Sequence, residues 1–189
     1  MKPHFNIPCV ILCGGKSSRM KEDKSLLPFA NKTSLAKYQY ERLKPYFNDV
    51  YLACKANKFD FHADLLLEDS DIYSPIVALN NIFTKLNSKK VFVITVDTPL
   101  VEISSISKII EESNSYDITV AKTKRVHSLC GVFSNNIKPL TIKMLSDDFH
   151  KVGYLLDNSN SKIVSFDNDD EFINLNRPED YQKALSLIK

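Results

Sequence analysis

Residues 9–27 read CVILCGGKSSRMKEDKSLL. Five apolar residues come first, two glycines follow, and a polar loop then carries cations at Lys16, Arg19 and Lys24. An unbroken apolar run of this length is typical of a parallel strand whose two faces are both covered by helices. In sheets of that kind, ligands bind beyond the carboxyl ends of the strands. The stretch therefore predicts an α/β fold with a ligand site where the first strand ends.

Apolar runs of strand length alternate with segments of helical period along the rest of the chain. The expected strands are residues 9–13, 50–54, 65–67, 91–96, 117–121 and 162–166. The expected helices lie within residues 36–47, 76–86, 103–110 and 178–188. This alternation predicts a Rossmann-like three-layer α/β/α sandwich with a mostly parallel central sheet. Residues 126–160 are harder to assign, and we expect substrate-side loops or an antiparallel excursion there.

Length and composition exclude several classes of protein. The chain has 189 residues, which fits one domain over residues 1–189. Its net charge of only +2 argues against a general binder of nucleic acid or membrane surfaces. The four cysteines form no Cys-x-x-Cys pair, so a zinc site is not expected. No apolar run approaches the roughly 20 residues that span a bilayer, and the N-terminus lacks signal-peptide features. A cytoplasmic location is expected.

The loop after the first strand has the ingredients of an anion site. It matches neither the Walker A pattern nor Gly-x-Gly-x-x-Gly. Gly14 and Gly15 carry no side chain, so their backbone N–H groups can approach a phosphate or a base edge closely. Arg19 can bind phosphate oxygens bidentately, and Lys24 supplies a mobile positive charge. A solvated glycine turn is the alternative, and the two cations at the end of a strand favour the anion site.

Three further sets of polar residues follow expected strands or precede the last helix. Asp97 ends the apolar strand 91–96, where a carboxylate can hold Mg²⁺ or can simply form an Asx turn before Pro99. Asp69 follows the third strand in a polar loop and is the weaker candidate. Asn174 and Asn176 alternate with apolar residues, which would point both amides the same way, towards a ligand or into solvent. The histidines are scattered, so the sequence offers no nucleophilic triad.

The opening loop resembles a known family motif. Residues 12–27 are similar to the Leu-Ala-Gly-Gly-x-Ser-x-Arg-Met-Gly-x-Asp-Lys-x-Leu-Leu signature of the molybdenum cofactor guanylyltransferases, within the sugar-nucleotidyltransferase-like enzymes. The resemblance extends along nearly the whole chain. The supporting motifs are residues 67–69, 74–78, 96–99, 130–133 and 173–180.

The resemblance implies an activity and a set of residue roles. Enzymes of this family join GMP from GTP to the molybdenum–molybdopterin cofactor and release pyrophosphate. Carried over by motif, Arg19 and Lys24 would bind the triphosphate and Asp97 would hold Mg²⁺, these three being the catalytic candidates. Asn174 and Asn176 would face the pterin-side substrate or the metal. The nucleotide contacts would come from Leu12, Cys13, Gly14, Gly15, Lys24, Asp69 and Asp97. Proteins that synthesise molybdopterin or receive the cofactor would be partners.

The sequence departs from the family pattern at several positions. Cys13 stands where Ala is usual, and Lys21 stands where Gly is usual. Residues 74–78 read SPIVA in place of the more typical Gly-Pro-Leu-Ala-Gly. Lys55 lies near a position that Asn often holds. These changes affect the expected base contacts more than the expected reaction.

Two other functions stay open at the level of sequence. A cytidylyltransferase acting on molybdopterin or on a small sugar or polyol phosphate would share the loop pattern. A non-catalytic nucleotide-binding or cofactor-delivery protein would share the phosphate contacts, although Asp97 together with Lys24 and Arg19 argues for chemistry. A dinucleotide-binding oxidoreductase is disfavoured because its glycine fingerprint is missing.

Overall fold

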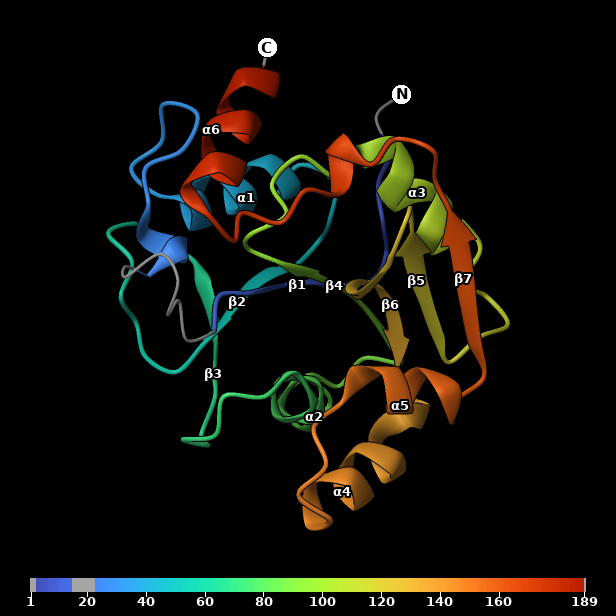
Figure 1. The fold of residues 1–189 in the computed structure, drawn as a ribbon. Helices are drawn as coiled ribbons and strands as arrows, with labels where there is room; N and C mark the ends of the chain where they lie inside the picture. The colour runs from blue at the N-terminus through green and yellow to red at the C-terminus, as the bar shows by residue number, and fades with distance from the viewer. Residues whose placement is uncertain (1–2, 15–22, 189) are drawn as a thin grey trace.

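The computed structural model describes residues 3–14 and 23–188 of the chain. Within them the strands are β1 (Cys9–Leu12), β2 (Val50–Cys54), β3 (Asp64–Leu67), β4 (Lys90–Thr95), β5 (Ile118–Lys122), β6 (Val126–Ser134) and β7 (Ser161–Ser165). They form one sheet in the order β3-β2-β1-β4-β6-β5-β7 (Figure 1). Every neighbouring pair is parallel except the two pairs that β6 makes, with β4 and with β5. The sheet is therefore mostly parallel, as predicted.

Helices cover both faces of the sheet (Figure 1). One layer contains α1 (Leu35–Leu43), α3 (Ile103–Glu111) and α6 (Pro178–Leu187). The other contains α2 (Pro75–Lys85), α4 (Lys138–Ser146) and α5 (Val152–Asp157). Each layer buries its own apolar cluster against the sheet. The predicted three-layer sandwich is thus confirmed, and no helix in the described part of the chain is long and apolar enough to cross a membrane.

Short-range signals in the sequence explain where the helices begin. Ser34 caps α1, because its hydroxyl accepts a hydrogen bond from the Lys37 N–H at 3.2 Å. Ser74 caps α2 in the same way, with proline at the first helical position. Proline also opens α6, where the Asp180 carboxylate accepts from the backbone N–H of Arg177 at 2.9 Å. These caps determine where α1, α2 and α6 begin, near the edge of the sheet at which the parallel strands end.

The six expected strands are all present, each within one residue of its predicted bounds. The antiparallel excursion expected in residues 126–160 is also present, as β6. The two short helices α4 and α5 in that region were not predicted. The first helix ends at Leu43. The prediction that it extends to Phe47 was therefore wrong. Phe47 instead pairs with Phe5 in an isolated bridge and stacks on Phe92.

Gly131 lies at a close approach between two strands of the sheet. It lies in β6 between β4 and β5, next to the register shift at Val120. A Cβ at position 131 would lie 2.1 Å from the carbonyl oxygen of Thr119. Only glycine leaves room for this contact between β5 and β6.

Candidate active site

Four of the residues singled out from the sequence lie in one hydrogen-bonded cluster beyond the carboxyl end of the sheet. The Lys24 ammonium is 3.2 Å from Oδ2 of Asp97 and donates to Oδ1 of Asn176 at 2.7 Å. Nδ2 of Asn174 is 3.4 Å from the other Asp97 oxygen. The side chains of Lys24 and Asp97 are largely buried, with 16% and 18% of their surface exposed. Three remote segments of the chain therefore supply one charged centre.

Backbone contacts explain why the two asparagines face this centre. Residues 173–176 form no strand, but the Leu175 N–H donates to the Asp97 carbonyl at 2.8 Å. Leu175 is buried in the core below α6. The Asn176 N–H donates to the Asn174 carbonyl at 2.8 Å, so residues 174–176 form a three-residue turn that buries Leu175 and leaves both amides at the charged centre. The sequence predicted that both amides point the same way, but this turn places them and not the alternation of a strand.

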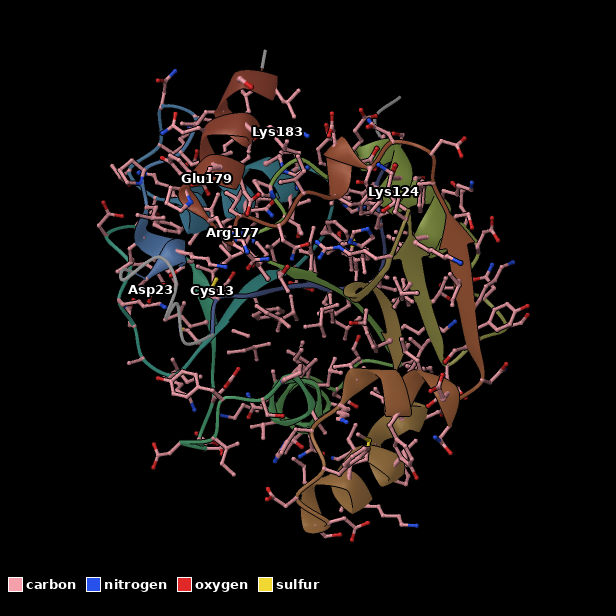
Figure 2. All side chains as sticks on the ribbon, viewed as in Figure 1. Cys13, Asp23, Lys124, Arg177, Glu179 and Lys183 are labelled. Atoms are coloured by element: carbon pink, nitrogen blue, oxygen red, sulfur yellow. The ribbon has the colours of Figure 1, made fainter. Side chains whose placement is uncertain are left out.

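A second set of contacts holds Lys24 in place. Lys24 begins a short 3-10 turn, η1 (Lys24–Leu26), which Asp23 caps by accepting from the Ser25 N–H at 3.0 Å. Lys58 pairs with Asp23 and also donates to the Cys13 carbonyl at 3.1 Å, so it connects the turn to the end of β1. Cys13 and Asp23 are labelled in Figure 2. Burial by itself would raise the pKa of Asp23, but hydrogen bonds from Lys58 and Ser25 hold that pKa below its usual value. Sequence reasoning missed Lys58 because nothing in its local pattern marks it.

Three adjoining hollows line this edge of the sheet. A pocket of about 300 Å³ lies between β1, β4 and the start of α2, bounded by Leu12, Gly14 and Thr95. A hollow of about 200 Å³ shares Thr95 and Leu129 with it. A third, of about 380 Å³, shares Arg125, His127 and Asn174 with the second. The hollows therefore adjoin one another, and the second and third reach the charged centre through Asn174 and Asn176.

The third hollow carries most of the positive charge. Lys124, Arg125 and Arg177 line it, and both Lys124 and Arg177 are labelled in Figure 2. The Arg125 guanidinium donates to Oδ1 of Asn174 at 2.6 Å, which connects this hollow to Asp97 through one amide. Asp169 and Asp180 also line it, and Lys124 lies 3.7 Å from Asp169, so the cations exceed the carboxylates by one and can bind an anion beside the Lys24–Asp97 centre. The sequence showed Lys124 and Arg125 only as part of a short basic run.

The proton positions on His127 follow from its partners. Thr123 Oγ1 donates to Asp169 at 2.6 Å, so at 2.8 Å it must accept from the Nε2–H of His127. The ring is buried and stacks on Phe172 at 4.8 Å. Burial, with a smaller contribution from Arg125, lowers the pKa of His127 below its usual value. A neutral imidazole therefore lines the hollow, with Nδ1 available as an acceptor.

The remaining predicted residues fall into four groups. Leu12 and Gly14 line the first pocket. The buried Cys13 thiol packs in the core on the α1 side, where burial raises its pKa above the usual value, and Cys13 does not line the first pocket. Asp69 is not part of the cluster, because its carboxylate is 81% exposed and pairs with Lys85 at 2.8 Å. Gly15 and Arg19 lie outside the described residues.

Ser74, His150 and Asp148 form a contact that the sequence did not suggest. His150 Nδ1 is 2.8 Å from Ser74 Oγ, and its Nε2 is 2.9 Å from Asp148. The order resembles a catalytic triad, but Ser74 Oγ already accepts from the Ile76 and Val77 N–H groups as the cap of α2. The Ser74 hydroxyl proton is therefore donated to His150 Nδ1, and the oxygen lone pairs accept from the two backbone N–H groups of α2. The set fixes the start of α2 beside the first pocket and is no nucleophilic site.

The comparisons with known proteins agree with this geometry. The MobA-like NTP transferase domain matches residues 9–158. A molybdenum cofactor guanylyltransferase from Campylobacter jejuni is 38% identical over 96% of both chains. One from Helicobacter pylori is 36% identical over 97% of this chain and 94% of its own. This chain belongs to the molybdenum cofactor guanylyltransferase family.

The solved structures extend the match to the fold. Molybdopterin-guanine dinucleotide biosynthesis protein A from Archaeoglobus fulgidus superposes with a TM-score of 0.82, at 16% identity, over 96% of this chain and 98% of its own. The family domain ends at residue 158, whereas the guanylyltransferase relatives align over nearly the full length. The segment with Asn174, Asn176 and α6 therefore lies beyond the family domain but within the alignment to the guanylyltransferase relatives.

Proposed function

We propose that this nucleotidyltransferase transfers GMP from GTP to the molybdenum–molybdopterin cofactor, forming the guanine dinucleotide and releasing pyrophosphate. The observation that carries the proposal is the contact of Lys24 with both Asp97 and Asn176 at the carboxyl end of the sheet. Family membership supports the choice of substrates. The first pocket, next to Gly14, is the place for the nucleoside of GTP. Lys24 would turn from Asp97 to the triphosphate and, with Arg19, neutralise its charge.

The donor set around Asp97 suits Mg²⁺. Among the described residues no three acidic or His/Cys side chains come together, so no all-protein metal site is formed. Mg²⁺ usually takes one or two carboxylates and fills its remaining positions with phosphates and water. Asp97 can supply the carboxylate and Asn176 an amide oxygen nearby. When bound there, Mg²⁺ would supply positive charge to the triphosphate.

The acceptor group, the terminal phosphate of molybdopterin, already carries negative charge. The protein therefore needs to position it but does not need to deprotonate it. The terminal phosphate of molybdopterin is ionised at neutral pH, and one of its oxygens would form the new bond to the α-phosphorus as the bond to pyrophosphate breaks. Lys124, Arg125 and Arg177 in the third hollow would hold this phosphate and reduce its repulsion from the triphosphate. Asn174 would orient Arg125 towards Asp97. No general base is required.

The deciding experiment is a product assay. The protein is incubated with Mg²⁺, molybdenum-loaded molybdopterin and either GTP or CTP, and the dinucleotide and pyrophosphate are measured. We expect guanine dinucleotide with GTP and little product with CTP. Asp97→Asn should lower turnover at least a hundredfold, since a neutral amide replaces the carboxylate, while circular dichroism stays unchanged. Product from CTP alone would establish the cytidylyltransferase, and GTP binding without product would establish a non-catalytic protein.

A further inference from the structure

Glu68 places a carboxylate at the wall of the first pocket. It follows β3, and its backbone N–H donates to the Cys54 carbonyl at 2.9 Å, which extends the pairing with β2 by one residue. By strand alternation its side chain shares a face with the buried Leu66, on the α2 side of the sheet. Its Oε1 lies 3.8 Å from the position that a Cβ on Gly14 would occupy. The carboxylate therefore borders both the pocket and the end of β1.

This carboxylate makes no hydrogen bond and no ion pair with any residue in the described part of the chain. Lys55 and Lys85 are the two cations in the region, but Lys55 donates to the carbonyls of Ser70 and Ile72. Lys85 pairs with Asp69. Glu68 is about half-buried, and burial raises its pKa, with a partly offsetting effect of the two lysines. A partly desolvated acceptor is thus left available to whatever enters the pocket.

The other walls of the pocket suit a flat heteroaromatic ring. Leu12, Ala78 and Leu129 contribute apolar surface from a strand end, a helix and a second strand. The Ser74 hydroxyl also borders the pocket, but its hydrogen bonds go to the α2 backbone and to His150. Glu68 is therefore the one acidic side chain among the described lining residues. A ligand with hydrogen-bond donors on one edge would be oriented by it.

Guanine matches this requirement among the common bases. Its N1–H and N2–H groups are adjacent donors, and the two oxygens of a carboxylate can accept both at once. Adenine and cytosine present an acceptor ring nitrogen at the corresponding position, which a carboxylate would repel. We propose that Glu68 accepts from the N1–H and N2–H edge of guanine and so selects GTP as the donor nucleotide. This inference rests on the proposed guanylyl transfer and names the residue that sets its base specificity.

The ribose offers a competing pair of donors. Its two hydroxyls could also bridge a carboxylate, and Glu68 would then contact every ribonucleotide equally. The two arrangements differ in what they recognise, the base edge in one and the sugar in the other. Nucleotides altered at a single group can therefore separate them.

The experiment measures binding of GTP, ITP, 1-methyl-GTP, 2′-deoxy-GTP and ATP to the full chain by calorimetry with Mg²⁺ and no acceptor. ITP lacks the N2 amino group, and 1-methyl-GTP lacks the N1–H. We expect the unaltered protein to bind each of these two about tenfold or more weakly than GTP, because a charged acceptor loses a donor. We expect 2′-deoxy-GTP to bind within a few-fold of GTP. These comparisons need no protein variant, so they hold whether or not a variant folds.

Glu68→Gln then removes the charge at constant shape. We expect GTP to bind about tenfold to hundredfold more weakly and its advantage over ITP and ATP to shrink by a similar factor. Asp71→Asn is the matched control, since it removes one exposed carboxylate from the neighbouring loop, and we expect no change in selectivity. An equal loss for all five nucleotides, or an unchanged preference for GTP over ITP in Glu68→Gln, would overturn the assignment of Glu68 alone. A separate titration with CTP tests guanylyl transfer itself, because a protein that binds CTP more tightly than GTP would overturn it.

Discussion

The effect of changing a single residue cannot be read from the family motifs alone. Cys13 departs from the usual alanine, yet its thiol is buried on the α1 side and only its backbone contacts Ala53 and Lys58. The substitution therefore changes a buried side chain, and the two backbone contacts do not depend on it. Gly131 has the opposite character, because it keeps the supporting motif of residues 130–133 and the close approach of β5 requires glycine there. The consequence of a change thus depends on the neighbours and not on the motif.

Gly131→Ala should destabilise the protein by about 1–3 kcal/mol, since the new Cβ would lie within 2.1 Å of the Thr119 carbonyl and force β5 and β6 apart. Urea unfolding followed by circular dichroism measures the change. Gly153→Ala is the control, because a Cβ there meets nothing within 4 Å. Gly153 lies in α5, so alanine should be neutral or stabilise by up to about 1 kcal/mol. Equal destabilisation by both variants would contradict the close contact.

At the scale of elements, the sequence predicted the parallel strands well because each is a continuous apolar run. It also located Asp97, Asn174 and Asn176, since polar residues that follow buried segments stand out in the pattern. It did not predict α4, of whose nine residues two are buried, or α5, which has only six residues. Contacts such as Arg125 with Asn174, or His150 with Ser74, join residues 49 and 76 positions apart. Local pattern carries no signal for such pairs, because they depend on the assembled sheet.

His127, near the start of β6, should make the free energy of unfolding depend on pH. The pKa of His127 is lowered in the fold, mainly by burial, with Arg125 lowering it further and Asp169 opposing. The unfolded chain, with an ordinary pKa near 6.5, then binds the proton more readily than the native state. The free energy of unfolding should therefore be fully retained above about pH 6.5. It should fall as the pH drops below that value, by at most about 1.4 kcal/mol per pH unit.

His127→Phe tests this, because it keeps a ring to stack on Phe172 and removes the titration. We expect its free energy of unfolding to vary less between pH 5 and 6.5 than that of the unaltered protein, whatever its absolute value. His62→Gln changes an exposed histidine and should leave the acid dependence as it was. An unchanged slope in His127→Phe would show that other groups cause the acid sensitivity.

Across the whole molecule, the site depends on both ends of the chain. Lys24 follows the first strand, Asp97 follows β4, and Asn176 precedes the last helix, with 152 positions between Lys24 and Asn176. The sheet brings these segments together because parallel strands end at one edge and α6 returns over it (Figure 1). The family domain, residues 9–158, does not include the asparagines. The last thirty or so residues are thus needed to complete the charged centre.

A double-mutant cycle measures this coupling between the two ends. Lys24→Ala and Asn176→Ala each remove one side of a 2.7 Å hydrogen bond with a charged donor, so each should lower the free energy of unfolding in the nucleotide-free protein. The double variant should lose less than the two single losses combined, with an interaction energy of about 0.5–3 kcal/mol. Asn176→Ala combined with Lys143→Ala on α4 is the control and should be additive within about 0.5 kcal/mol. Additivity of the Lys24 and Asn176 changes would mean that the contact contributes nothing to holding the last segment on the sheet. In that case α6 and the buried Leu175 alone would keep the asparagines in the site.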